Sequence, residues 1–299
     1  MFTLNFKKRG LWDKKTEILF FKDAANFATS EQLFYSTDDG RLLAYWPKKY
    51  EGKKTTIQAR NALIGNYTEK WTTDLVQHAV EDKGLYAIQG AVCDEIGLPK
   101  SSPADVIIST EKGIEQDPEN ILLVVEVKMS IVWNWELLVN GSMNKLICNG
   151  DYRSHAGTPG LLRSDSMLKA IGKSINIRVS SFKAASIPII IMGNTPITNS
   201  YYYKVDHLKK AGIIQGFWSV NPTPLDDETV YITETDNKGF YTFKLFEEFK
   251  NSLDSLLNED LNFFSSMKTK TELGNIIEIS NKEKTYEKKA EMFLNLIRR

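Results

Sequence analysis

Two carboxylates and a lysine stand at the ends of two apolar segments near the centre of the chain. Asp105 precedes the apolar run 106–108, and Glu126 and Lys128 stand at the end of the run that begins at Ile121. A carboxylate buried without a partner costs several kcal/mol, so apolar surroundings do not select acids by accident. Acids on neighbouring strands with a lysine beside them therefore indicate a site for a divalent metal ion.

A metal site of this kind is suited to phosphodiester hydrolysis, because the metal supplies a nucleophilic water and a sink for negative charge. Mg²⁺ prefers oxygen ligands and keeps several waters, so few protein carboxylates suffice. Strand alternation places Glu126 and Lys128 on one face, with Val127 opposite. We predict Asp105, Glu126 and the Val127 carbonyl as metal ligands. Lys128 is expected to orient or deprotonate the attacking water, or to steady the scissile phosphate.

Over residues 66–192 this pattern resembles the PD-(D/E)xK nuclease superfamily. The segment Glu126-Val127-Lys128 matches the second motif of that superfamily without change. The segment Pro103-Ala104-Asp105 departs from the first motif by one residue inserted between the proline and the acid. Many members also carry a glutamate on the helix before the sheet, and Glu69 stands at the matching position. The resemblance implies a catalytic set of Asp105, Glu126, Lys128 and Glu69, with Mg²⁺ as cofactor.

Among the subfamilies, the length and character of the chain are similar to those of type II restriction endonucleases. That resemblance implies site-specific cleavage of double-stranded DNA by a homodimer, with one active site for each strand and no organic cofactor. Two alternatives stay open. One is a repair, recombination or transposon-type nuclease on the same core, and the other is a non-catalytic DNA-binding protein on a nuclease-like scaffold.

Each motif residue also has a purely structural interpretation. Asp105 could accept turn hydrogen bonds at the start of a strand. Glu126 and Lys128 could form the solvated face of an edge strand, although the continuous apolar run before them favours a central, buried strand. Glu69 could lie on an exposed helix face, where glutamate is common.

Candidate DNA contacts follow the metal motif in the sequence. Helix N-termini attract phosphate, and basic side chains on one helix face can follow a nucleic-acid backbone. A polar, glycine-containing loop at 152–160 precedes the expected helix 164–179 and could wrap DNA or simply connect two elements. Ser164 could alternatively only cap this helix. The predicted DNA-binding residues are Arg153, Arg163, Ser164, Lys169 and Lys173.

The periodicity of the chain predicts an α/β fold with a mixed central β-sheet flanked by helices, as in a restriction-endonuclease-like core. The segment 66–83 is expected to be a helix, with apolar residues at spacings of four and Gly84 after its end. A second helix, 164–179, is expected to bury Met167, Leu168, Ile171 and Ile175. Strands are expected at 85–92, 104–110, 121–132, 187–192, 229–233 and 240–243, and further helices at 203–212, 245–264 and 282–299.

We divide the chain into an N-terminal β-rich extension at 1–60, a nuclease core at 61–220, and a C-terminal strand and helix region at 221–299 packed on the core. Residues 38–40 read as a hairpin turn. The segment 133–160 shows no clear periodicity. The closing helices are expected to carry charged outer faces.

Bulk composition limits the possible classes of protein. The chain has 299 residues, 38 basic and 38 acidic side chains, and two cysteines. The zero net charge weakens the nucleic-acid interpretation, although basic clusters occur locally, such as Lys48-Lys49 with Lys53-Lys54. Two cysteines are too few for a secreted disulfide scaffold. With neither a signal peptide nor a membrane-spanning run in the sequence, we expect a cytoplasmic protein without membrane contact.

Histidines and tryptophans near the metal motif are expected to play structural roles. His155 is expected at the surface rather than in catalysis. Trp133 and Trp135 are expected in the core or in a dimer interface. Cys93 and Cys148 lack the spacing of zinc ligands, so no zinc site is predicted.

Overall fold

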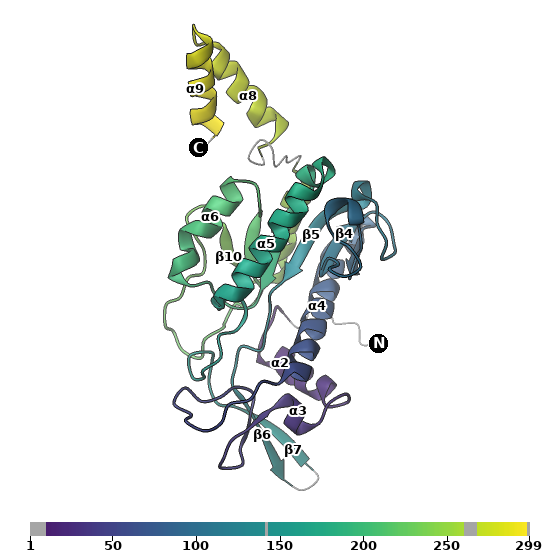
Figure 1. Cartoon of the computed structure of the whole chain (residues 1–299), viewed down its shortest axis with the longest axis vertical. Coiled ribbons are helices and arrows are strands. Elements are labelled where there is room, and N and C mark those ends of the chain that lie inside the picture. The colour runs from purple at the N-terminus through teal and green to yellow at the C-terminus, as the bar shows by residue number, and fades with distance from the viewer. Residues whose placement is uncertain (1–9, 141–142, 260–267, 298–299) are drawn as a thin grey trace.

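The computed structural model describes residues 10–140, 143–259 and 268–297, and its centre is a mixed six-stranded sheet (Figure 1). The strand order is β10-β9-β8-β5-β4-β3. β5, β8, β9 and β10 run parallel, whereas β3 and β4 pair antiparallel with their neighbours. The bounds are β3 Tyr86–Gln89, β4 Val106–Ser109, β5 Ile121–Val127, β8 Ile189–Gly193, β9 Gly216–Ser219 and β10 Phe240–Thr242.

Helices cover both faces of this sheet. α4 (Gln58–Val80) and α7 (Phe246–Asn258) contribute to one apolar core, and α5 (Ser164–Ser180) and α6 (Tyr202–Lys210) contribute to the other. The predicted α/β class, with a mixed sheet between helices, is therefore confirmed. Single turns of 3-10 helix connect the elements at Glu81–Lys83, Asp94–Ile96, Pro118–Asn120, Gly160–Leu162, Phe182–Ser186 and Asn199–Tyr201.

β5 occupies the middle of the sheet because both of its faces are apolar. Leu123 and Val125 pack into the core beneath α4, whereas Val124 packs into the core beneath α5. Alternation then directs Val127 to the α4 side and Glu126 to the α5 side. The strand ends at Val127, five residues earlier than expected, since the chain leaves the sheet there for a second sheet.

α4 begins eight residues before the expected helix and ends at Val80, three residues before the expected end. Its buried stripe includes Trp71, Leu75, Val76, Ala79 and Val80, which confirms the predicted face. After one turn of 3-10 helix, Gly84 adopts a left-handed conformation with φ +70°. Glycine carries no Cβ, so it enters this region at little cost and lets the chain turn back into β3.

The N-terminal region contains more helix than predicted, and the expectation of a β-rich extension is wrong in this respect. α2 (Lys14–Ala24) begins at Asp13, whose side chain accepts a hydrogen bond from the Thr16 amide, and α3 (Ser30–Leu33) follows. From residue 10 onward, where the structure describes this region, it contains two short strands, β1 (Tyr35–Ser36) and β2 (Leu42–Leu43), joined by the predicted hairpin turn. They extend the hairpin of β6 (Trp135–Asn140) and β7 (Met143–Cys148) into a four-stranded sheet, order β1-β2-β6-β7.

Three expectations about the second half of the chain need correction. Arg163, not Ser164, stands at the N-cap of α5 and makes no side-chain cap hydrogen bond. α5 buries Met167, Ala170, Ser174, Ile177 and Arg178, whereas Leu168 and Ile175 are exposed. No strand forms at 229–233.

The C-terminal region ends in two helices. α8 (Lys270–Asn281) was not predicted, and α9 (Tyr286–Ile297) lies within the helix expected at 282–299. The end of the helix expected at 245–264 falls partly outside the described residues. In the described ranges we find no helix with the length and apolarity needed to cross a lipid bilayer.

Candidate active site

Asp105 and Glu126 meet because β4 and β5 pair antiparallel at this point. Val106 lies opposite Val125, so the residue before β4 lies beside the end of β5. The Val127 amide donates a hydrogen bond to Asp105 Oδ2 over 2.7 Å. This bond joins two neighbouring strands and is not the turn hydrogen bond considered for Asp105, and it leaves Oδ1 for another partner.

Lys128 lies between the two acids. Its Nζ is hydrogen-bonded to Glu126 Oε1, and it lies 3.6 Å from Asp105 Oδ2. The same Nζ donates to the Val127 carbonyl over 3.1 Å. Three oxygens that the sequence predicted as metal ligands therefore surround one ammonium group.

A second lysine closes the cluster from α5. Lys173 Nζ lies 2.7 Å from Glu126 Oε2 and 3.2 Å from Asp105 Oδ1, and it donates to the Pro103 carbonyl over 2.8 Å. Each carboxylate thus presents one oxygen to each ammonium group. We refer to Asp105, Glu126, Lys128 and Lys173 as the acid–lysine cluster.

Burial and mutual repulsion perturb the charges of this cluster. Burial of Glu126, followed by the nearby charge of Asp105, raises the pKa of its carboxyl, while Lys128 and Lys173 oppose that rise. Burial lowers the pKa of Lys173, but the two acids outweigh it and the net pKa is raised. Perturbed groups that share one site are typical of functional sites, although structural ion-pair networks also produce them.

Glu69 borders the cluster from α4. Its Oε2 accepts a hydrogen bond from Gln89 Nε2 over 3.1 Å. Burial and then the charge of Asp105 raise the pKa of Glu69, and Lys173 and Lys128 act on it in the opposite direction. The helix therefore brings Glu69 within electrostatic range of the cluster, as its predicted role requires.

The donor set of the cluster is suited to a hard divalent cation. Two carboxylates and a backbone carbonyl already face positive charge, and Mg²⁺ takes the same oxygen types. The described ranges contain no group of three or more His, Cys, Asp or Glu side chains arranged to hold a metal. Two acids and a carbonyl remain sufficient for Mg²⁺, because it keeps several waters of its own.

The predicted DNA-binding residues separate into three environments. Arg163 and Lys169 are exposed at the start of α5, where each pairs with Asp165, over 3.3 and 3.0 Å, and Ser164 stands beside them. Arg153 is less available, because its guanidinium pairs with Asp151 and Asp227, over 2.6 and 3.0 Å. Lys173 belongs to the acid–lysine cluster, where its ammonium group pairs with Asp105 and Glu126, so the DNA contact expected of it stays a prediction.

Sequence reasoning missed the part that Lys173 plays in the cluster and the support that Gln89 gives to Glu69. The position of Lys173 beside the buried stripe of α5 was an available signal, since a long side chain next to such a stripe can reach inward. The alternating residue pattern of β3 does not indicate that Gln89 would contact Glu69.

The segment after Lys128 is largely apolar and buried. Trp133 and Trp135 are buried in the core, which is one of the two positions expected for them.

His155 is also buried, which corrects its expected surface position. Its ring stacks on Tyr45, and Nε2 lies 3.2 Å from the Val132 carbonyl. Burial lowers the pKa of His155 to about 4, so its imidazole is neutral at pH 7.

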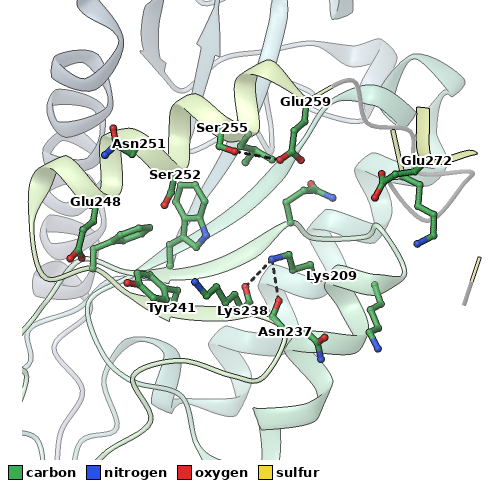
Figure 2. A pocket seen from close by; sticks show the side chains of 16 residues that line it. Lys209, Asn237, Lys238, Tyr241, Glu248, Asn251, Ser252, Ser255, Glu259 and Glu272 are labelled. Atoms are coloured by element: carbon green, nitrogen blue, oxygen red, sulfur yellow. Dashed lines mark hydrogen bonds between the residues drawn. The ribbon is translucent and has the colours of Figure 1, made fainter. Parts of the chain in front are cut away.

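A separate cavity of about 760 Å³ lies between α7, β10 and the ends of α6 and α8 (Figure 2). Lys209 points into it and donates hydrogen bonds to the carbonyls of Asn237 and Lys238. The lining mixes lysines with glutamates such as Glu248 and Glu259. It shares no residue with the acid–lysine cluster, and no predicted site residue lines it.

No family model, no curated protein and no solved structure matches this chain. The relation to the PD-(D/E)xK superfamily therefore stays a prediction based on the motif residues.

Proposed function

We propose that this protein is a Mg²⁺-dependent endonuclease that hydrolyses double-stranded DNA at specific sites, as type II restriction enzymes do. The observation that supports it most directly is the acid–lysine cluster. It joins Asp105, Glu126 and Lys128 at the end of a central strand, with the Val127 carbonyl on the same ammonium group. A salt-bridge network with only a structural role would not require the backbone carbonyl to face the same cation.

In this proposal Asp105, Glu126 and the Val127 carbonyl hold Mg²⁺, which supplies an activated water and neutralises charge on the phosphate when bound. Lys128, which pairs with Glu126 in this structure, would orient the water or steady the scissile phosphate. Lys173 holds the outer carboxylate oxygens and opposes the rise in the pKa of Glu126 that burial causes. Glu69 completes the acid set from α4.

Contacts to DNA are assigned to the start of α5. Arg163 and Lys169 are exposed there beside Ser164, and the helix N-terminus adds free amide donors. Arg153 stays in the proposed set but must exchange its carboxylate partners for phosphate. Cleavage of both strands calls for a second active site, so we propose a homodimer, acting in the cytoplasm without an organic cofactor.

Digestion of a sequenced plasmid with mapping of the ends tests this proposal. We expect discrete fragments with Mg²⁺, none with EDTA, and none from Lys128→Ala with Mg²⁺. Fixed ends support a restriction-type enzyme, whereas cleavage confined to branched or damaged substrates supports a repair or recombination nuclease. A chain that binds duplex DNA but leaves it intact under all metal conditions contradicts the nuclease proposal.

Replacing Lys173 by methionine separates its role in the cluster from the DNA-contact role expected from the sequence. We expect cleavage to fall by about 10–100-fold, since one cation that favours ionised Glu126 is lost. The acidic limb of the pH–rate profile should shift to higher pH, because the pKa of Glu126 rises further without that cation. Duplex affinity, measured by fluorescence anisotropy without Mg²⁺, should be unchanged.

Lys169→Met serves as the matched control on the same helix, because its side chain is exposed and lies outside the cluster. It should weaken duplex binding and leave the pH profile in place. If Lys173→Met instead weakened binding and left the pH profile unmoved, the assignment of Lys173 to the cluster chemistry would be wrong.

A further inference from the structure

A strongly basic loop connects β2 to α4 in the chain. Residues 47–56 contain Lys48, Lys49, Lys53 and Lys54, all exposed, and one acid, Glu51. We refer to these residues as the lysine loop. Its four ammonium groups contrast with the zero net charge of the whole chain.

The lysines of this loop are not committed to acids within the described part of the chain. Elsewhere in that part of the chain, most lysines that form ion pairs lie within 3.5 Å of a carboxylate. Lys14 lies 2.7 Å from Asp226, and Lys250 lies 2.7 Å from Asp82. No ion pair of this kind involves any of the four loop lysines in the described ranges. Asp38 lies against the loop at Gly52. Four lysines against Glu51 and Asp38 leave the local charge positive.

Aromatic packing gives the lysine loop a fixed base. The ring of Tyr50 stacks on Trp46 with centroids 4.6 Å apart, and Trp46 stacks in turn on Tyr35. The indole of Trp46 donates to the Thr55 carbonyl over 3.4 Å, which ties the start of the loop to its end. The hydroxyl of Tyr50 accepts a hydrogen bond from the Asp38 amide over 3.2 Å. A compact loop with its ends joined presents its charges with less loss of conformational entropy than a free tail.

The loop is connected to the proposed active site through the segment that precedes α5. Pro47 forms a β-bridge with His155, and the Ala156 amide donates to the Trp46 carbonyl over 2.8 Å. A few residues later, Gly160 packs against the Lys128 carbonyl. A Cβ atom on Gly160 would lie 3.3 Å from the Lys128 carbonyl oxygen. In Figure 1 the purple chain of this region lies in the lower part of the molecule with β6 and β7, below β4 and β5.

We propose that the lysine loop binds the phosphate backbone of duplex DNA next to the site of cleavage. This inference rests on the proposed function and extends it, because it assigns DNA contact to residues outside α5. Lysine is a compact point charge on a flexible stem, which suits phosphates rather than base edges. The loop therefore contributes affinity that is independent of sequence and sensitive to salt.

The test compares two variants of the full chain that lose the same charge. The loop variant changes Lys48, Lys49, Lys53 and Lys54 to glutamine. The control variant changes four other exposed lysines to glutamine, Lys244, Lys282, Lys284 and Lys288. Binding of several unrelated 30-base-pair duplexes is measured by fluorescence anisotropy in EDTA over a series of KCl concentrations, and circular dichroism melting verifies that all three proteins are folded.

We expect the loop variant to bind every duplex at least about tenfold more weakly at 100 mM KCl, with the control unchanged. The slope of log affinity against log salt should fall in magnitude by up to about 3.6, since each of the four lost phosphate contacts removes about 0.9. Equal affinity and slope for the wild type and the loop variant overturn the inference, as does an equal loss in the control. If duplex binding depends on the lysine loop but the protein shows no Mg²⁺-dependent cleavage, the DNA-binding role of the loop is supported and the nuclease proposal is rejected.

Discussion

Replacement of Glu126 by glutamine will reduce Mg²⁺-dependent DNA cleavage by about 10³-fold or more, corresponding to about 4 kcal/mol of lost transition-state stabilisation. The amide keeps the shape of the side chain but removes the charge that Lys128 and Lys173 now face. Hydrolysis of an end-labelled duplex under single-turnover conditions measures the loss. Duplex affinity in EDTA should not fall, because Glu126 is buried and its charge does not face the DNA-binding surface directly.

Glu228→Gln is the matched control for this substitution, since Glu228 is an exposed glutamate outside the cluster. It should cleave at the rate of the wild type. A Glu126→Gln protein that is folded and cleaves within a factor of about three of the wild type, less than 1 kcal/mol, would remove Glu126 from the chemistry.

The second large effect is expected at Glu17, which is fully buried on α2. Its two oxygens accept hydrogen bonds from the indoles of Trp12 and Trp135, over 3.2 and 2.8 Å, and from the amides of Val132 and Trp133, over 2.6 and 3.3 Å. Glutamine in its place turns an NH₂ group toward N–H donors. We expect Glu17→Gln to lower the free energy of unfolding at pH 6 by about 2–4 kcal/mol.

The stability of the wild type should also depend on pH through this residue. Burial raises the pKa of Glu17 to about 8, against the opposing effect of its four N–H donors. Between about pH 4.5 and 8 the folded protein keeps a proton that the unfolded chain has lost, so the free energy of unfolding falls as pH rises. The slope is at most about 1.4 kcal/mol per pH unit and levels off above the folded pKa.

Urea unfolding of the wild type and Glu17→Gln at several pH values between 5 and 9 measures both effects. The destabilisation caused by glutamine should be largest near pH 5 and smallest above pH 8, because glutamine does not titrate. Glu228→Gln should stay within about 0.5 kcal/mol of the wild type throughout. A destabilisation that is constant with pH would show that Glu17 has the same charge in both states.

Those parts of the fold that follow from local sequence pattern were predictable. The continuous apolar run of β5 identifies a central strand, and Trp71, Leu75 and Ala79 identify the buried face of α4. The acids were predictable for the same reason. A carboxylate in a buried strand is costly, so the sequence itself marks Glu126 as a residue that must find positive charge.

What depended on tertiary packing was not predictable. On α5, Leu168 and Ile175 are apolar yet exposed, because the sheet meets the face that carries Met167, Ala170 and Ile177. That rotation turns Lys173 inward to the acids. In the same way, α2 lacks a strong apolar stripe, and its stability depends on residues far along the chain, such as Trp133 and Trp135.

Direct measurement of divalent metal binding tests the central claim, that Asp105 and Glu126 together hold a cation beside Lys128. Free Mn²⁺, used in place of Mg²⁺, can be counted by electron paramagnetic resonance during titration of the full chain without DNA. We predict at least one bound Mn²⁺ for each wild-type chain, retained in Glu228→Gln and lost in Asp105→Asn and Glu126→Gln. Equal Mn²⁺ binding by all four proteins would contradict the account.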